Sequence, residues 1–233
     1  ILIALQINNW HENRKLRIQE VKYLKNLQTD LITELKSNDS MIVYRNNKAR
    51  AAASILTYTP PKTPEQIYKF EKTFELVYFW KTFIPSNNTF KELSSSGNLN
   101  TLKNDSLKYY LLELDKMYVE IANYEHHMRR EYEQYIYDVA IPNTDILNFF
   151  DFEQIPETGK LKKIDLAKIQ PEQVKKMEDE IVWILNNKTL RNAMRLSVMN
   201  NRLLKNKHVD MRKHIERMIE LIDQDLGSDK KKP

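Results

Sequence analysis

The sequence predicts an all-α fold, an elongated up-down-up-down helical bundle with one irregular loop. Three observations support this prediction. The chain has only 3 Gly among 233 residues, whereas tight hairpins and glycine-rich phosphate loops depend on the positive φ angles that glycine allows. Long stretches carry apolar residues at alternating spacings of three and four, which is the period of a helix face. Hydrophobic residues make up 41% and charged residues 30% of the chain, which is atypical of a disordered chain or a polytopic membrane protein.

The first long helix is predicted to extend from the start of the chain to about Tyr58. Its apolar seam begins at Val21 and is wide, as in a helix packed inside a bundle. Two consecutive prolines at 60–61 follow, and they end the helix because proline lacks the backbone donor and clashes with the preceding turn.

The next two helices are predicted from their capping signals. Thr63 and Gln66 form a capping box around a proline at the first helical position, so a helix begins there and ends before Pro85. A second capping box begins at Thr89 and starts a short helix that Gly97 terminates. Together these pieces predict a fourth column of the bundle.

The third long helix is predicted to begin at Asn104 or Asp105 and to end near Pro142. Its seam is apolar or aromatic at nearly every position. The seam consists of Leu107, Leu111, Leu114, Tyr118, Ile121, Glu125, Met128, Tyr132, Tyr135 and Val139.

The irregular loop is predicted over residues 141–170. A turn signal at 157–160, Glu-Thr-Gly-Lys, is compatible with a small β-hairpin. Pro171 then starts a short helix, and a last long helix is predicted from about Leu190 to Gly227.

The first ten residues, ILIALQINNW, look like the last third of a membrane span with Trp10 at the interface. A complete span needs about 20 apolar residues, so the natural protein is expected to begin with a basic stretch and a full span. The alternative is the apolar start of an ordinary amphipathic helix. The predicted organisation is therefore a span remnant at 1–10, a bundle domain at 11–226 and a disordered basic tail at 227–233.

The motifs of common enzymes are missing from the sequence. Cysteine is absent, which excludes disulfides and thiol catalysis, and no P-loop, GxGxxG or HExxH occurs. His127 and Glu131 are four residues apart, but two ligands do not make a metal site. Three of the net +5 charges lie in the lysine run 230–232, so the rest of the chain is nearly balanced and does not favour nucleic acid. We expect no enzyme, no catalytic residue, no cofactor and no metal.

Polar residues interrupt the predicted helix seams. A buried polar group needs a partner, and such residues commonly fix helix register in bundles. Glu125, Asn201 and His208 are therefore predicted to form a buried polar layer, and the alternative is a small-ligand cavity at that level. The other interruptions are Gln28, Asn38, Arg45 and Ser197.

Phe149, Phe150 and Phe152 bring three aromatic rings within four residues of the predicted loop. Exposed aromatic clusters tend to mark interaction sites, so these residues are candidate contacts for an unknown protein partner. The alternative is that all three cap the core at an open end of the bundle.

Two stretches resemble a known family. The first ten residues followed by HENRKLRIQEVKYLKNLQTDL (11–31) resemble the membrane-proximal start of an uncharacterised Bacteroidetes family of single-pass, membrane-anchored helical proteins with a domain of unknown function. TFKELSSSGNLNTLKNDSL (89–107) resembles its second signature. The resemblance implies an anchor in the bacterial inner membrane and offers no catalytic residues.

Membrane orientation and function follow as expectations from that resemblance. A basic segment before the span places the folded domain in the periplasm by the positive-inside rule, although Arg14, Lys15 and Arg17 favour the opposite orientation. The expected function is that of a membrane-anchored interaction or scaffold domain. The alternative is an extracytoplasmic bundle that senses a ligand. The oligomeric state is left open.

Overall fold

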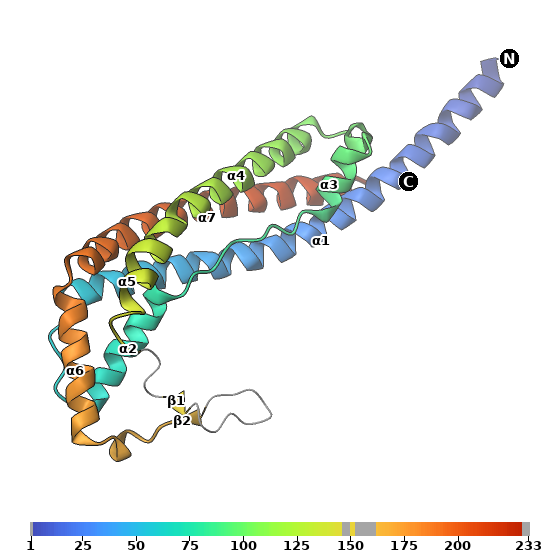
Figure 1. The fold of residues 1–233 in the computed structure, drawn as a ribbon. Helices are drawn as coiled ribbons and strands as arrows, with labels where there is room; N and C mark the ends of the chain where they lie inside the picture. Colours follow the sequence, from blue (N-terminus) through green and yellow to red (C-terminus); the bar gives the residue numbers. More distant parts are fainter. Residues whose placement is uncertain (1, 146–149, 152–161, 230–233) are drawn as a thin grey trace. The chain divides into compact units, whose positions relative to one another are not determined.

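The computed structural model describes residues 2–145, 150–151 and 162–229, and it confirms the predicted all-α helical bundle (Figure 1). Its α-helices are α1 (Leu2–Leu56), α2 (Pro64–Tyr78), α3 (Asn88–Ser95), α4 (Asp105–Arg130), α5 (Asp138–Ala140), α6 (Pro171–Asn186) and α7 (Lys188–Asp229). Short 3₁₀ helices are η1 (Asn98–Thr101) and η3 (Leu166–Lys168), and a π-helix, η2 (Glu131–Tyr137), joins α4 to α5. Two short strands are β1 (Phe150–Asp151) and β2 (Lys162–Lys163).

The chain divides into two compact units, and α1, α4 and α7 contribute to both. Unit 1 comprises Ile1–Ile42, Phe83–Asn123 and Asn206–Pro233. Unit 2 comprises Val43–Thr82 and Tyr124–Lys205.

In unit 1, α7 runs antiparallel to α1. Gln28 Nε2 donates to Asp223 Oδ1 over 2.5 Å, and Asn38 Nδ2 donates to the His208 carbonyl over 2.8 Å. Residue numbers therefore rise along α1 as they fall along α7. The core of the unit consists of the buried seam residues of these helices and α4, including Leu24, Leu27, Leu31, Leu107, Leu111, Leu114, Ile121, Met211, Ile215 and Met218.

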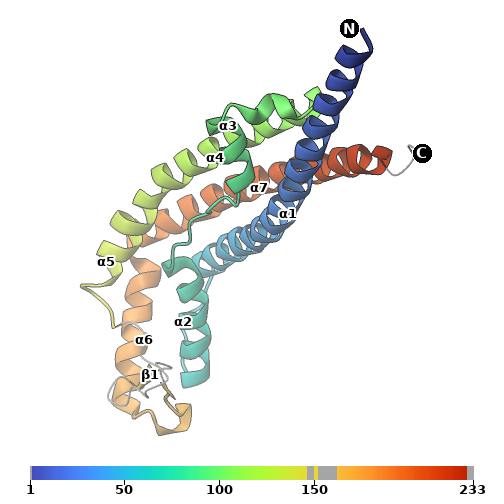
Figure 2. The same ribbon diagram turned by 90° about the vertical axis from the view of Figure 1, so that its right-hand side faces the viewer.

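In unit 2, α2 and α6 lie side by side (Figure 2). Their apolar faces pack with the last turns of α1, the first turns of α7 and the η2–α5 region around one hydrophobic core. Its most buried members include Ala52, Ile67, Phe70, Val77, Ile136, Ala140, Leu190, Ala193 and Met194.

The capping predictions are confirmed at two helix starts. Thr63 Oγ1 accepts from the Gln66 amide at α2, and Asn104 Oδ1 accepts from the Leu107 amide at α4. The structure adds a cap at α7 that was not predicted, where Asn187 Oδ1 accepts from the Leu190 amide. At α3 the prediction is wrong, because the Thr89 amide donates to an α1 carboxylate instead of being part of a capping box.

Strands β1 and β2 pair antiparallel, with Phe150 opposite Lys163 and Asp151 opposite Lys162. The small hairpin left open by the sequence is therefore present. Its turn signal at 157–160 lies outside the described residues, as do 230–233 of the predicted basic tail. The first part of that tail is helical instead, since α7 continues through Gly227 to Asp229.

The predicted inner-membrane location, with its periplasmic domain, is contradicted by the helices themselves. Among the described residues, every helix is either too short or too polar to cross a membrane. In α1 the physical reason is that the apolar run from Leu2 reaches Glu12, Arg14 and Lys15 without any interruption of the helix.

Candidate functional site

The most unusual feature of unit 2 is a set of charged side chains inside its helical core. Arg45 and Lys48 on α1 are 0% and 1% exposed, and Glu125 on α4 is 2% exposed. Glu131 at the start of η2 and Asn201 on α7 are also buried. We call these five residues the charge cluster. Ionised side chains are almost never fully buried unless they are paired, so their partners determine what the cluster can do.

Arg45 joins three helices and one connecting segment. Its Nη2 forms an ion pair with Glu125 Oε1 over 2.5 Å, and its Nη1 donates to Asn201 Oδ1 over 3.2 Å. Asn201 is fixed in turn, because its Nδ2 donates to the Ser197 carbonyl and hydroxyl. Nη2 also donates to the Lys81 carbonyl over 3.0 Å. The guanidinium thus holds α1, α4 and α7 in one register.

Lys48 and Tyr44 hold the segment that follows α2. Lys48 Nζ donates to the Phe79 carbonyl over 2.7 Å, and the Tyr44 hydroxyl donates to the same oxygen over 2.9 Å. The same hydroxyl accepts from the Lys81 amide over 3.0 Å. These bonds satisfy the backbone of an extended segment, and they explain why α2 ends at Tyr78 rather than just before Pro85.

Aromatic rings complete the surroundings of the two cations. The Trp80 ring centroid lies 4.9 Å from the Arg45 guanidinium carbon and 5.1 Å from Lys48 Nζ. The Tyr132 ring stacks on Trp80 with centroids 6.1 Å apart and lies 5.5 Å from Lys48 Nζ. Cation–π attraction of this kind strengthens when the cation is desolvated.

Burial changes the ionisation of the cluster. It lowers the pKa of the Lys48 ammonium to about 7, although the Glu131 carboxylate acts in the opposite direction. Burial likewise raises the pKa of Glu131, against hydrogen bonds from Asn200 and Ser197 that lower it. A lysine whose pKa lies near 7 can serve as a base or nucleophile. Lys48, however, is 1% exposed, and its Nζ donates to the Phe79 carbonyl of the same chain. We therefore assign Lys48 a structural role.

The predicted polar layer is divided between two sets of contacts. Glu125 and Asn201 meet through Arg45, as described above, whereas His208 belongs to unit 1. His208 is 0% exposed, and its Nδ1 lies 2.8 Å from Asn38 Oδ1. Its ring packs edge-on against Phe83 with centroids 5.0 Å apart. All three residues are buried, but only two of them share a partner.

Sequence reasoning missed Lys48 and Glu131. The predicted seam passed through Tyr132 and Tyr135, yet Glu131 and Ile136 are buried and Tyr135 is 37% exposed. The cause is η2, since a π-helix adds a residue to the turn and rotates the buried face. For Lys48 the available signal was its spacing of three residues from Arg45, which places both on one helix face.

A second polar contact set lies in unit 1. Glu34 on α1 accepts from the Ser86 amide over 2.6 Å, and Asp30 accepts from the Thr89 amide over 2.8 Å. Burial raises the pKa of Glu34. A cavity of about 10 Å³ beside Tyr118 and Asn87 has room for no more than about one water molecule.

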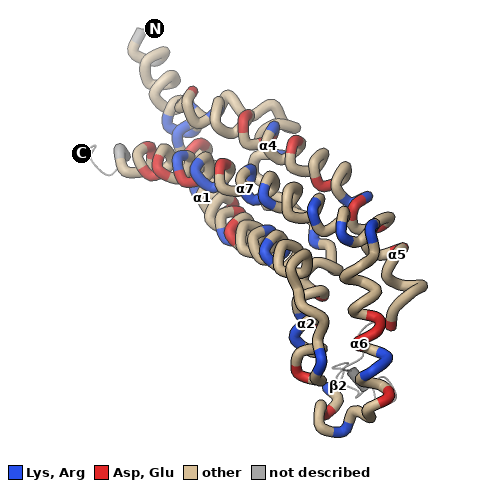
Figure 3. Tube along the Cα trace, turned by 90° about the vertical axis from the view of Figure 1, so that its left-hand side faces the viewer, with Lys and Arg blue, Asp and Glu red and all other residues tan. Residues whose placement is uncertain are grey.

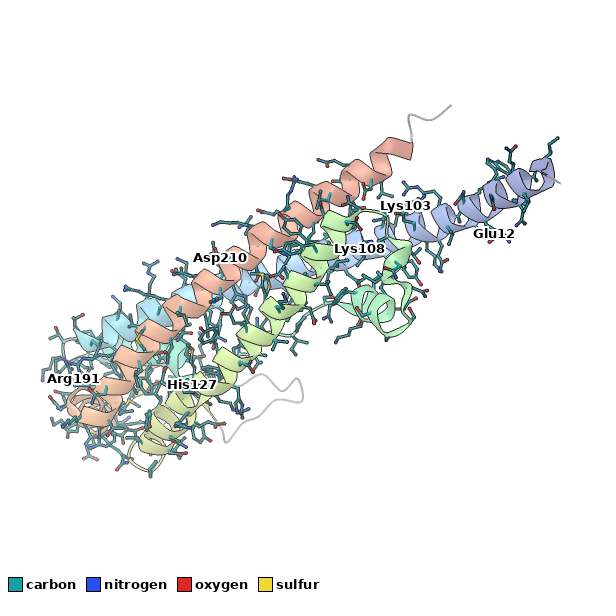
Figure 4. All side chains as sticks on the ribbon, turned by 90° about the horizontal axis from the view of Figure 1, so that it is seen from above. Glu12, Lys103, Lys108, His127, Arg191 and Asp210 are labelled. Atoms are coloured by element: carbon teal, nitrogen blue, oxygen red, sulfur yellow. The ribbon has the colours of Figure 1, made fainter. Side chains whose placement is uncertain are left out.

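His127 and Glu131, which are four residues apart in the sequence, lie in different surroundings. Glu131 is buried and accepts from Asn200 Nδ2 over 2.6 Å, whereas His127 is exposed near the end of α4 (Figure 4). His127 lines a polar surface groove with Arg130 and their neighbours on α4 and η2. Within the described residues, no group of three or more His, Asp or Glu is arranged to hold a metal ion.

The aromatic loop cannot be placed. Phe149 and Phe152 lie outside the described residues, and for Phe150 only the backbone of β1 is described. The partner contact expected at these three residues therefore stays a prediction.

Comparison with known proteins adds no further constraint. No protein-family model matches this chain, and no curated protein or solved structure is similar to it. The resemblance to a Bacteroidetes family therefore stays a hypothesis, and function has to be argued from the described side chains.

Proposed function

We propose that this protein is a helical interaction domain that binds a partner protein through exposed helix faces. One observation carries the proposal. At the beginning of α1, Ile3, Ile7 and Trp10 are 73%, 58% and 60% exposed. Their spacing of four and three places them on one helix face, and anchors with this spacing are typical of a helix that docks into an apolar groove.

The surroundings of these anchors define the partner. The Arg14 guanidinium lies 5.6 Å from the Trp10 ring centroid. The His11 ring also stacks on the Trp10 ring, with centroids 5.7 Å apart. The anchor face therefore continues into a basic side chain. The matching surface is an apolar groove with an acidic group at the end nearer Arg14.

The charge cluster has a structural role inside unit 2, where it fixes the register of the helices that it joins. Breaking a buried ion pair leaves an uncompensated charge, so Arg45 and Glu125 penalise any change of helix register. Their side chains contact one another directly, and neither of the cavities described above is lined by the charge cluster. Ligand sensing, the alternative expected from the sequence, is therefore not supported by either of these two cavities among the described residues.

The proposal predicts a cross-link that depends on helix face. A photoreactive phenylalanine analogue in place of Ile7 should capture a single protein in the cells that make this chain, whereas the same analogue at Asn9, on the opposite side of α1, should not. The product is identified by mass spectrometry and the partner is then purified. Ile3→Ser with Trp10→Ser should weaken its binding about 30-fold, since buried aromatic anchors contribute about 2 kcal/mol or more.

The folded state serves as the control for that experiment. Because both side chains are exposed, the free energy of unfolding should change by no more than about 0.5 kcal/mol. Equal cross-linking from positions 7 and 9, or binding that survives the double substitution, would falsify the proposal.

A further inference from the structure

One face of α7 in unit 2 combines an apolar row with an arginine row. Leu196, Met199 and Leu203 are 37%, 60% and 38% exposed, and their spacing of three and four aligns them along the helix. Arg195 and Arg202 are also exposed and lie seven residues apart, which makes a second row beside the first. We call these five residues the α7 face. It is separate from the anchors at the start of α1.

The segment of α7 that carries this face contains basic side chains but no acidic ones. Residues 188–205 contain five Lys or Arg and no Asp or Glu, and residues 43–56 of α1, in the same unit, also lack Asp and Glu. Figure 3 shows the basic positions along α7. The Arg195 guanidinium donates to the neutral Asn192 amide oxygen over 2.8 Å. Within the described part of the chain, no ion pair joins Arg195 or Arg202 to a carboxylate.

Other basic side chains of this helix have internal roles, which distinguishes them from the α7 face. Arg191, in the first turn (Figure 4), donates to the Leu185 carbonyl over 3.0 Å and to the Leu56 carbonyl over 3.4 Å. It therefore ties α7 to the ends of α6 and α1. Arg195 and Arg202 make no comparable bond to a neighbouring helix among the described residues, and their positive charge faces outward.

We propose that the α7 face binds an acidic amphipathic helix of a partner protein. The row of Leu196, Met199 and Leu203 packs against the apolar stripe of that helix, and Arg195 and Arg202 pair with its carboxylates. Charge complementarity favours this occupant. A second copy of the same face is disfavoured, because two surfaces that both lack acidic residues repel each other.

The test uses three synthetic helical peptides of equal length and apolar pattern. Their polar positions are all Glu, all Gln or all Lys, and each peptide is labelled for fluorescence anisotropy with the full chain. The Glu peptide should bind about tenfold more tightly than the Gln peptide, and its affinity should fall as salt is added. The Lys peptide should not bind. Equal affinity for the Glu and Gln peptides would contradict the proposal.

Matched variants locate the contact on the α7 face. Arg195→Ala with Arg202→Ala should weaken binding of the Glu peptide about fivefold to tenfold, since exposed ion pairs contribute up to about 1 kcal/mol each. The control, Lys69→Ala with Arg130→Ala, removes the same charge elsewhere in unit 2 and should change the affinity less than about twofold. An equal loss in both double variants would show a general charge effect and overturn the proposal.

The apolar row and the competing occupants are tested separately. Met199→Ser should weaken binding of the Glu peptide at least as much as either arginine substitution alone. The control Leu76→Ser, at an exposed position of α2, should leave the affinity unchanged. Sedimentation velocity and binding to phosphatidylserine vesicles complete the test. The proposal would be overturned if the Glu peptide failed to bind and the wild-type chain instead dimerised or bound vesicles, with that activity lost in the arginine double variant. Dimerisation would assign the α7 face to a second copy of the chain, and vesicle binding would assign it to lipid.

Discussion

Replacing Glu125 with Ala is expected to lower the free energy of unfolding by about 3–5 kcal/mol. The reason is the position of Arg45, whose side chain is 0% exposed and pairs with Glu125 Oε1 over 2.5 Å. Without the carboxylate, a desolvated guanidinium remains in the core, and the hydrogen-bond acceptors that it keeps, Asn201 Oδ1 and the Lys81 carbonyl, are neutral. Urea denaturation at neutral pH measures the loss directly from the transition midpoint.

A second carboxylate in unit 2 provides the control. Glu133 accepts from Arg129 Nε over 2.6 Å, but the two side chains are 47% and 59% exposed, so Glu133→Ala should cost no more than about 1 kcal/mol. An apolar replacement of both buried partners, Arg45→Met with Glu125→Leu, should recover most of the loss because no charge is then left unpaired. Equal losses for Glu125→Ala and Glu133→Ala would contradict the assignment of a buried ion pair.

The helices were predictable because most of the core follows a regular period. The seam of α4 from Leu107 to Met128 is buried as predicted, with Leu111 and Ile121 at 2% and 1% exposure. The prediction fails where backbone geometry departs from that period. At η2 the π-helix rotates the buried face, and a local pattern of Tyr and Ile residues carries no sign of it.

The end of α2 shows a different limit. The stretch Phe79–Trp80–Lys81 is compatible with a helix by its residues alone, but its carbonyls are bound by Tyr44, Arg45 and Lys48. Those donors are over 30 residues away in the chain. Tertiary contacts therefore override local propensity, as they commonly do, and no local signal could have revealed this.

For the buried polar groups, the sequence identified positions but not partners. Arg45, Glu125, Asn201 and His208 each interrupt an apolar seam, so their burial could be predicted. Which of them meet depends on the relative register of α1, α4 and α7, which a helical period does not determine. The structure pairs Arg45 with Glu125 and Asn201, and it pairs His208 with Asn38.

Stability should depend on pH through Lys48 in a direction opposite to that of a typical lysine ion pair. Burial lowers its pKa from 10.5 to about 7, so between these two values the unfolded chain binds a proton that the folded chain does not. The free energy of unfolding therefore rises with pH in this window. The penalty for charging the buried ammonium is complete below about pH 7, and it disappears above about pH 10.5.

The neighbours of Lys48 affect how this titration is measured. On α1, burial raises the pKa of Tyr44, so its hydroxyl stays neutral. On η2, burial raises the pKa of Tyr132 and the pKa of Glu131, and the Glu131 carboxylate raises the pKa of Lys48 through its charge. The experiment is therefore made both in the wild-type chain and in a Glu131→Gln background, which removes that carboxylate.

Comparing the wild-type chain with Lys48→Met isolates the contribution of this one group. The difference in the free energy of unfolding, wild type minus variant, should increase between about pH 7 and pH 9 by up to about 1.4 kcal/mol per pH unit. Urea denaturation at half-unit intervals of pH measures it. The same comparison for the exposed Lys69→Met should give a difference that does not change with pH. A flat difference for Lys48→Met, or one that falls as pH rises, would mean that the Lys48 ammonium is stabilised in the core by the Phe79 carbonyl and the Trp80 and Tyr132 rings more than burial destabilises it.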